Sequence, residues 1–211
     1  MAIISHRGGR GLATENTIEG VEIADKYHPK YIEFDIQKTV DKQLILFHNL
    51  ALDDGRKIRN LTYAEILETV PHVPLMSDAI NALVYATALI ELKSSDIAQD
   101  CYAISRFSDC DYTSFIDEEI SCLRQLDPNS TLFLMQHKHP VGLVDKAIAI
   151  KANGIGINKN YMLFLPFIFR KAKKHKLQVY VYTLNNRLTA VLLRLFYPTV
   201  MICTDYPNKI I

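Results

Sequence analysis

Short apolar runs alternate with segments of helical periodicity along the whole chain. The apolar runs, which predict β-strands, cover residues 2–5, 31–37, 44–47, 86–92, 111–115, 131–135, 154–157, 178–183 and 200–204. Apolar positions at helical spacing fill residues 16–27, 62–69, 77–84, 95–107, 117–125, 140–152, 163–174 and 187–196. Strands that alternate with helices are typical of a parallel sheet with helical crossovers, so we predict an α/β fold.

One connection between predicted strands is too short for a helical crossover. Six residues separate Gln37, at the end of one strand, from Leu44, at the start of the next, whereas a crossover needs about a dozen or more. These two strands are therefore predicted to form an antiparallel hairpin. A register centred on residues 40–43 would pair Asp35 with His48, and such cross-strand neighbours lie about 5 Å apart at Cβ.

Without the return arm of this hairpin, eight strands remain. Eight strands joined by helices predict a closed (β/α)8 TIM barrel, formed here by the single domain 1–211. Polar side chains stand at or just after the C-terminal ends of several predicted strands, the end that carries the active site in such barrels. They are His6, Arg7, Glu33, Asp35, Glu91, Lys93, Ser114, Thr183, Asn185, Thr204 and Asp205.

Composition limits the classes of partner and compartment. The chain has 211 residues, of which 49% are hydrophobic, and a net charge of +1. A balanced charge gives no broad field for nucleic acid or an anionic membrane, and the lysines and arginines of residues 170–176 are predicted to form a solvated helix face. The four cysteines form no CxxC pair, so we expect free thiols in a reducing, cytoplasmic compartment. We find no signal peptide and no run long enough to span a bilayer.

The first quarter of the chain carries the clearest chemistry. Glu33 and Asp35 lie two residues apart in an apolar run, so on a strand both face the same side. Buried carboxylates need a counter-charge, and a cation is the natural partner. His6 and His48 supply groups that exchange protons near neutral pH. A metal beside an acid/base pair is typical of a hydrolase or a lyase.

Several motifs resemble the glycerophosphodiester phosphodiesterase family, within the phospholipase-C-like phosphodiesterase TIM barrels. They are HRGGRGLATENT at residues 6–17, EFDIQKTVDKQLILFHN at 33–49, IELK at 90–93, TSF at 113–115, VYTLN at 181–185 and CTDYP at 203–207. The first two blocks are highly specific, whereas IELK and TSF alone are weak. The resemblance spans nearly the whole chain in family order.

The resemblance implies a metal site at Glu33, Asp35 and Glu91. Three oxygen ligands without a cysteine suit Mg²⁺ or Ca²⁺. The alternative is that Glu33 and Glu91 are simply ion-paired with Arg7 and Lys93. Arg7 and Lys93 are themselves expected to bind and neutralise the phosphodiester. They could do so and still pair with the acids.

The resemblance also implies that His6 and His48 are the acid/base pair, without deciding which is the acid. Among supporting residues, Asn16 is predicted to cap the first helix, and Glu15 to support Arg7 or the metal site from behind. Tyr182 either lines the site or packs against a helix. The stretch Gln136-His137-Lys138-His139 precedes Pro140, which favours a loop over an HxH metal pair.

The chain departs from the family pattern after the second histidine, where Asn49 replaces the usual Asp. The implied function is nevertheless metal-dependent hydrolysis of a small glycerophosphodiester to sn-glycerol 3-phosphate and an alcohol, with no nucleic-acid partner. Two alternatives stay open: a lysophospholipase D-type or other phosphodiester hydrolase, and a barrel that binds a phosphodiester without turnover. The sequence makes no prediction of the oligomeric state.

Overall fold

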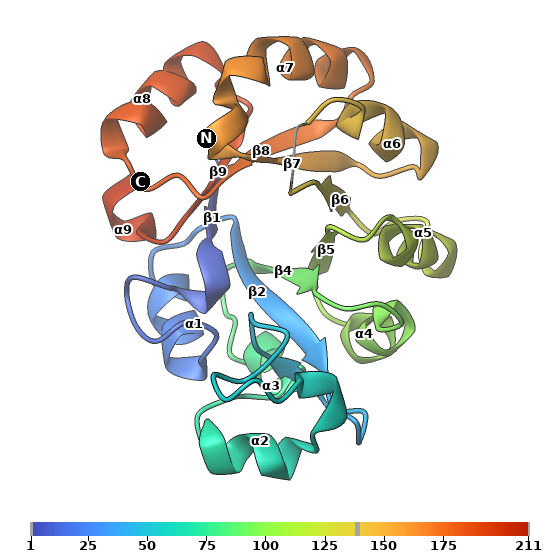
Figure 1. The fold of residues 1–211 in the computed structure, drawn as a ribbon. Helices are drawn as coiled ribbons and strands as arrows, with labels where there is room; N and C mark the ends of the chain where they lie inside the picture. The colour runs from blue at the N-terminus through green and yellow to red at the C-terminus, as the bar shows by residue number, and fades with distance from the viewer. Residues whose placement is uncertain (1, 138–139, 211) are drawn as a thin grey trace.

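Eight parallel strands close into a barrel in the computed structural model, which describes residues 2–137 and 140–210 (Figure 1). The order around the barrel follows the sequence, and the barrel closes because the first strand pairs with both the second and the last. The predicted TIM-barrel fold is therefore confirmed. The barrel strands are β1 (Ile3–Ser5), β2 (Tyr31–Lys38), β4 (Thr87–Leu92), β5 (Cys110–Ser114), β6 (Leu132–Met135), β7 (Gly154–Asn158), β8 (Gln178–Tyr182) and β9 (Met201–Thr204).

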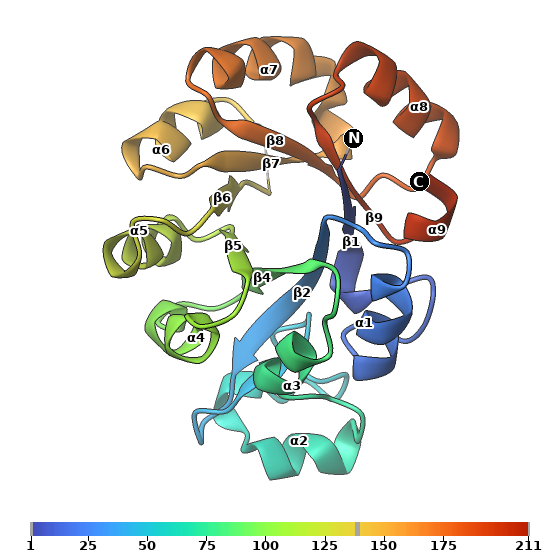
Figure 2. The ribbon, with the colours of Figure 1, turned by 180° about the vertical axis from the view of Figure 1, so that it is seen from behind.

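Helices surround the barrel on its outside, as Figures 1 and 2 show from opposite sides. The α-helices are α1 (Ile18–Asp25), α2 (Tyr63–Thr69), α3 (Met76–Asn81), α4 (Ala98–Ser105), α5 (Asp117–Leu126), α6 (Leu143–Ala149), α7 (Leu165–Lys174), α8 (Arg187–Phe196) and α9 (Pro207–Ile210). In the described part of the chain, three short 3-10 helices lie in connections: η1 (His6–Gly8), η2 (Ile58–Asn60) and η3 (Lys159–Phe164). The 3-10 helices and α9 are absent from the sequence prediction, because elements this short show no hydrophobic period. No helix in the described ranges is long and apolar enough to cross a membrane.

Side-chain alternation along β2 explains how an apolar strand delivers acids to the barrel interior. Ile32, Phe34 and Ile36 face the surrounding helices and belong to the main core. The other set begins with Tyr31, which packs inside the barrel, and continues toward the C-terminal end with Glu33 and Asp35. Both faces of the strand are buried, which is why it reads as a continuous apolar run.

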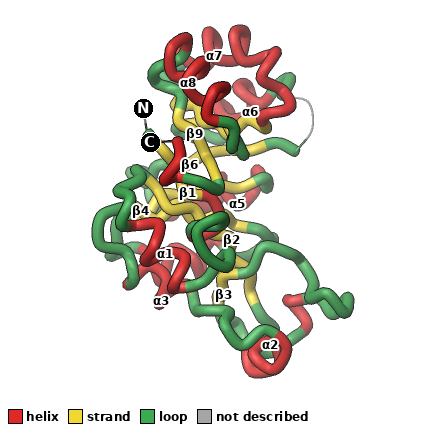
Figure 3. Tube along the Cα trace, turned by 90° about the vertical axis from the view of Figure 1, so that its left-hand side faces the viewer, coloured by secondary structure: helices red, strands yellow, loops and turns green. Residues whose placement is uncertain are grey.

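The strand β3 (Leu44–Leu46) pairs antiparallel with the end of β2. It carries a small core of its own, formed by Ile45, Leu52, Ile58, Leu61, Ile66 and Val73. Figure 3 shows this segment and α2 projecting from the barrel. The part of the molecule around β3 and α2 therefore has its own hydrophobic support beside the barrel end.

The register predicted for this pairing is wrong by one residue. Ile36 lies opposite Leu46, and the Phe47 N–H donates to the Asp35 carbonyl at 3.0 Å, so Phe47 and not His48 is the neighbour of Asp35. The reason lies in the turn. Thr39 donates its N–H to the Gln43 carbonyl, and Lys42 adopts a left-handed backbone with φ 64°, which gives an odd-numbered loop.

Candidate active site

Three buried carboxylates meet at the C-terminal end of neighbouring strands. Asp35 on β2 lies opposite Glu91 on β4 in the parallel register, and Glu33 precedes Asp35 on the same face. A ligand oxygen of each lies within 4.8 Å of the others. Their residues are only 4%, 1% and 7% exposed. The predicted trio therefore assembles, in an arrangement that offers three carboxylate oxygens to a cation.

The electrostatics of this trio are unfavourable without a cation. Burial, then the charges of Asp35 and Glu91, raise the pKa of Glu33 well above its ordinary value. Burial and Asp35 likewise raise the pKa of Glu91 to about 7, against the opposing effect of Lys93. Oε1 of Glu33 is buried and has no hydrogen-bond partner among the described residues. An unpartnered carboxylate oxygen among other acids is the feature that a metal ion would satisfy.

Asp35 differs from its neighbours because more cationic and hydrogen-bonding groups surround it. Burial opposes its ionisation, yet Lys93, His48, Asn16 and Arg7 outweigh that effect and hold its pKa below the ordinary value. Lys93 Nζ lies 3.2 Å from Asp35 Oδ1 and 2.7 Å from Glu91 Oε1. Lys93 is thus the internal counter-charge of the site.

Asn16 is not the helix cap that the sequence predicts. Thr17 caps α1, where its side chain accepts from the Gly20 N–H. Asn16 instead adopts a left-handed backbone, φ 55°, and donates Nδ2 to Asp35 Oδ2 at 2.9 Å while its Oδ1 accepts from the Asp35 N–H at 3.3 Å. This contact could not be predicted from the sequence, since Asn before Thr fits a cap equally well.

Arg7 is held in the turn after β1. Its backbone is left-handed, with φ 50°, and its N–H donates to Glu33 Oε2 at 2.8 Å. The guanidinium contacts Glu15 at 3.0 Å and lies 3.9 Å from Asp35 Oδ2. Glu15 therefore positions Arg7 beside the acids, and the ion pairing of Arg7 goes to Glu15 more closely than to the trio.

His6 has a carboxylate partner that motif analysis did not assign. Ser5 of β1 lies opposite Thr204 of β9, so the residues that follow them, His6 and Asp205, stand side by side. His6 Nδ1 lies 2.6 Å from Asp205 Oδ1, and His6 lines the pocket. The sequence features that pointed to Asp205 were the CTDYP motif and its position at the end of the last strand.

Asp205 is itself fixed by the segment after β8. Asn185 donates Nδ2 to Asp205 Oδ2 at 2.6 Å and accepts from the Asp205 N–H at 2.9 Å. Burial opposes ionisation of Asp205, but the hydrogen bonds from His6 and Asn185 outweigh it and lower its pKa. A hydrogen-bonded carboxylate behind Nδ1 holds the imidazole in one tautomer and orientation.

His48 follows β3 on the other side of the acids. Its Nδ1 lies 2.8 Å from Asn49 Oδ1, so the amide at this position orients the ring. Burial lowers the pKa of His48; the charge of Asp35 opposes this effect, and Lys93 adds to it. Net lowering favours the neutral imidazole, the form that accepts a proton.

A pocket of about 310 Å³ joins these groups. It is lined by His6, Arg7, Glu33, His48, Leu89, Glu91, Lys93, Phe115, Met135, His137, Asn158, Lys159, Asn160, Tyr180, Tyr182, Thr183 and Cys203. The pocket lining therefore includes both predicted catalytic histidines, both predicted phosphate-binding residues and two of the three predicted metal ligands, Glu33 and Glu91. The third, Asp35, is buried beside them. Glu15 and Asn16 do not line this pocket but contact Arg7 and Asp35 respectively.

One wall of this pocket is aromatic. Phe115 and His137 stack with ring centroids 3.6 Å apart, and Tyr182 meets Phe115 edge-on at 5.9 Å. Tyr182 thus lines the pocket, while its hydroxyl donates to the Gln136 carbonyl. His137 lines the pocket from the stretch 136–139, which was predicted to be a loop rather than an HxH metal pair. Lys138 and His139 of that stretch lie outside the described residues.

The model of the Glycerophosphoryl diester phosphodiesterase family matches residues 6–209. The chain belongs to this family. It is accordingly an enzyme of the glycerophosphodiester phosphodiesterase class, as its motifs predicted. The match spans every group of the pocket described above, from His6 to Asp205.

Individual relatives agree with this assignment. The chain is 26% identical to the glycerophosphodiester phosphodiesterase of Bacillus subtilis (strain 168), with 97% of this chain and 83% of that protein covered. Two solved structures share the fold. The glycerophosphodiester phosphodiesterase of Thermotoga maritima has a TM-score of 0.86 at 18% identity, covering 99% and 96% of the two chains. An Oleispira antarctica phosphodiesterase in complex with the product sn-glycerol-3-phosphate has a TM-score of 0.85 at 20% identity, covering 100% and 95%.

Proposed function

We propose that the enzyme hydrolyses glycerophosphodiesters to sn-glycerol 3-phosphate and an alcohol in a reaction that depends on a divalent metal ion. The observation that carries this proposal is the buried trio Glu33, Asp35 and Glu91, with an unpartnered oxygen on Glu33. Glu33 and Glu91 line the same pocket as His6 and His48. The product complex of the Oleispira antarctica phosphodiesterase supports the choice of product.

The trio fits Mg²⁺ or Ca²⁺, because its donors are all carboxylate oxygens. When bound, such an ion would neutralise phosphate oxygens and stabilise the charge that develops in the transition state. Arg7 and Lys93, both at this pocket, bind the same anionic group. Arg can contact two phosphate oxygens at once, whereas Lys acts as a point charge.

Proton transfer falls to the two histidines. His48 is neutral because burial lowers its pKa, so it takes a proton from the attacking water as the new P–O bond forms. His6 gives a proton from Nε2 to the leaving alkoxide as the ester P–O bond breaks, while Asp205 at 2.6 Å stabilises the charge on its ring. Each turnover consumes one water molecule. Afterwards His48 releases its proton to solvent and His6 takes one up, which restores both residues.

The division of roles can be tested by the leaving group. A p-nitrophenyl ester leaves without protonation, so His6→Ala should retain most activity on a p-nitrophenyl phosphodiester and lose it on glycerophosphocholine. His48→Ala should lose activity on both. Equal losses for His6→Ala on the two substrates would refute the assignment of His6 as the acid.

The function itself is tested by release assays with glycerophosphocholine, glycerophosphoethanolamine and a lysophospholipid, each with and without a chelator. We expect sn-glycerol 3-phosphate from the first two, abolished by chelation and restored by Mg²⁺ or Ca²⁺. Glu33→Gln should lose metal-restored activity, whereas Glu118→Gln, an exposed acid on α5, should behave as wild type. Activity on the lysophospholipid alone would show that the proposed substrate class is wrong. Turnover that resists the chelator would show that the reaction does not depend on a metal ion.

A further inference from the structure

The net charge of +1 conceals a strong asymmetry along the chain. Between Asp145 and Asp205 there is no acidic residue, while ten of the 24 lysines and arginines lie there. The remainder of the chain carries 14 cations against 23 acids, a net charge of −9. The segment 146–204 contains most of α6, the strands β7, β8 and β9, and the helices η3, α7 and α8, so one side of the barrel is cationic.

The outward face of α8 is apolar. Ala190 and Leu193 face the core, and on a helix the residues offset from them by half a turn point to solvent. Leu188 and Leu195, seven residues apart and on one face, are 70% and 73% exposed. The same face includes Val191 and Leu192, which are exposed as well, and exposed Phe196 lies at its edge. An amphipathic helix normally places polar residues there.

The neighbouring helix α7 continues this surface and adds charge to it. Phe167 is 77% exposed, and Leu163 at the preceding turn is 89% exposed. Arg170 and Lys174 follow Phe167 at helical spacing and are exposed on the same face. Phe169 meets Tyr197 at 5.1 Å, which joins α7 to the end of α8, and Figures 1 and 2 show the two helices side by side.

We propose that this surface, the α7–α8 face, docks on an anionic lipid bilayer. It is defined by Leu163, Phe167, Arg170, Lys174, Leu188, Val191, Leu192 and Leu195. Exposed apolar side chains interleaved with lysine and arginine are the composition that binds at the headgroup boundary, where apolar groups enter the acyl region and cations meet anionic headgroups. Large exposed apolar patches are otherwise rare on soluble proteins.

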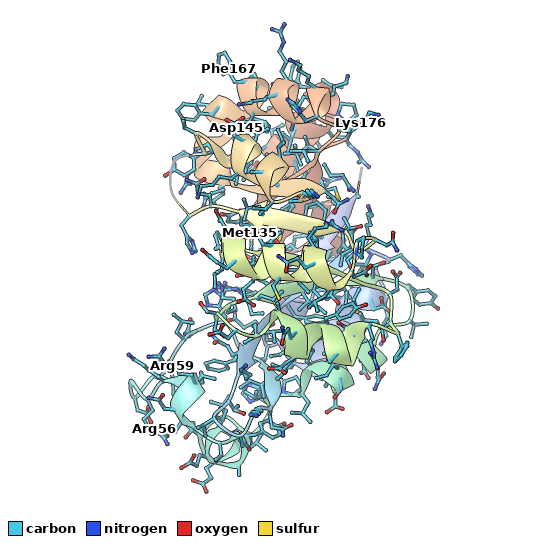
Figure 4. All side chains as sticks on the ribbon, turned by 90° about the vertical axis from the view of Figure 1, so that its right-hand side faces the viewer. Arg56, Arg59, Met135, Asp145, Phe167 and Lys176 are labelled. Atoms are coloured by element: carbon cyan, nitrogen blue, oxygen red, sulfur yellow. The ribbon has the colours of Figure 1, made fainter. Side chains whose placement is uncertain are left out.

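The apolar end of the face adjoins the pocket. Lys159 and Asn160, which line the pocket, begin the 3-10 helix η3 that ends beside Leu163 and leads into α7. Phe167 lies in the first turn of α7, which follows the C-terminal end of β7 through η3. Figure 4 shows it on the opposite side from Lys176, which lies just beyond the other end of the helix. Docking through the α7–α8 face therefore brings the pocket close to the bilayer, whatever its substrate.

The charge of the α7–α8 face favours an anionic bilayer over a second copy of the chain as its partner. The described ion pairs of this segment engage only Lys146 and Lys171, with Asp117 and Asp145 on neighbouring helices. Arg170 and Lys174 have no ion pair among the described residues, so their charge is available to anionic headgroups. The outward faces of two helices are convex, and a fluid bilayer adapts to such a shape without a complementary groove.

Co-sedimentation of the whole protein with vesicles tests the proposal. We expect binding to phosphatidylcholine vesicles that contain phosphatidylglycerol, little binding to pure phosphatidylcholine, and weakening with salt. The double variant Arg170→Gln/Lys174→Gln should reduce the partition coefficient about thirtyfold, because each cation near an anionic surface contributes about fivefold. Phe167→Gln and Leu188→Gln should also weaken binding, by about tenfold or more each.

Phe107→Gln provides a matched control, since Phe107 is 88% exposed but follows α4, outside the α7–α8 face. All these variants should keep wild-type hydrolysis of a soluble phosphodiester, which separates docking from the proposed chemistry. The proposal is overturned if the wild type does not bind anionic vesicles, or if Phe107→Gln weakens binding as much as Phe167→Gln. Concentration-dependent self-association that Leu188→Gln abolishes, without vesicle binding, would instead assign the face to a second copy of the chain.

Discussion

Replacing Glu91 by glutamine should stabilise the metal-free protein at pH 8. Glu91 is buried beside Asp35, and burial and that charge raise its pKa from 4.5 to about 7. Between these two values the folded protein holds a proton that the unfolded chain has released, so the free energy of unfolding falls as the pH rises. Above pH 7 Glu91 is ionised in both states, and the loss of folding stability caused by its burial is complete. A shift of this size corresponds to about 3 kcal/mol.

Glutamine has the shape of the protonated acid and cannot ionise. In chelator, Glu91→Gln and the wild type should therefore have similar stability near pH 4.5 and diverge above it, until the variant is about 3 kcal/mol more stable at pH 8. For a chain of this length that difference is about 6–12 °C in Tm. The comparison requires the same buffer series for both proteins, with unfolding followed by calorimetry.

Metal should reverse the order of stability. A ligand that binds only the folded state stabilises it by about 4.1 kcal/mol at a thousandfold excess over Kd. This gain belongs to the wild type with its complete trio, and it exceeds the difference of about 3 kcal/mol expected in chelator at pH 8. The reasoning is refuted if the two proteins show parallel pH profiles in chelator, or if metal stabilises Glu91→Gln as much as the wild type. Glu118→Gln, which changes an exposed acid, should follow the wild type throughout.

Three further predictions concern the residues around the trio. Asp205→Asn should lower kcat on glycerophosphocholine by about 10- to 100-fold, and an unchanged kcat would show that Asp205 does not position His6. The same variant should make stability depend less on pH in acid. The pKa of Asp205 is lower in the folded protein than its ordinary value of 3.8, so the wild type has stability above pH 3.8 that it loses as the pH falls through the folded value. Asn16→Ala should cost about 2–3 kcal/mol in urea unfolding, since it removes two hydrogen bonds from buried Asp35, and a loss under ~0.5 kcal/mol would contradict that. Asn49→Asp places a negative charge where the amide oxygen now lies 2.8 Å from His48 Nδ1, so the acid limb of kcat/KM should move to higher pH; a limb that stays in place would mean that His48 is not the titrating base.

The barrel and its acidic trio could be predicted from sequence because local patterns determine them. Nine apolar runs at regular spacing predicted the strands, and Glu33 and Asp35 at a two-residue spacing had to share a face. Glu91 followed from its strand-end position and its motif. Strand periodicity and the rule that parallel strands end at one edge of the sheet place these acids together, and the family resemblance implied that they form a metal site.

Contacts that depend on register or on competing local uses of a side chain could not be predicted. The Asp35–His48 pairing failed because one left-handed residue, Lys42, changes the loop by one position. Asn16 has the residue type of a helix cap, and only the fold shows that its amide reaches Asp35. The partnership of His6 with Asp205 joins residues at opposite ends of the chain through the pairing of β1 with β9.

The surface charge shows the same limit at a larger scale. A net charge of +1 predicted no field for an anionic membrane, and the cations of α7 were expected only to be solvated. The barrel gathers the acid-free segment on one side, where the apolar residues of α8 are also exposed. A sum over the chain cannot report such a separation, because it depends on which elements are neighbours in space.

Diffraction from a crystal soaked in Mn²⁺, an anomalous scatterer that takes the same oxygen ligands as Mg²⁺, tests the central claim most directly. We predict one strong anomalous peak in bonding distance of carboxylate oxygens from Glu33, Asp35 and Glu91, and its loss in Glu33→Gln. A map with no peak at the trio, or with the same peak in Glu33→Gln, would contradict the metal site on which the proposed chemistry rests.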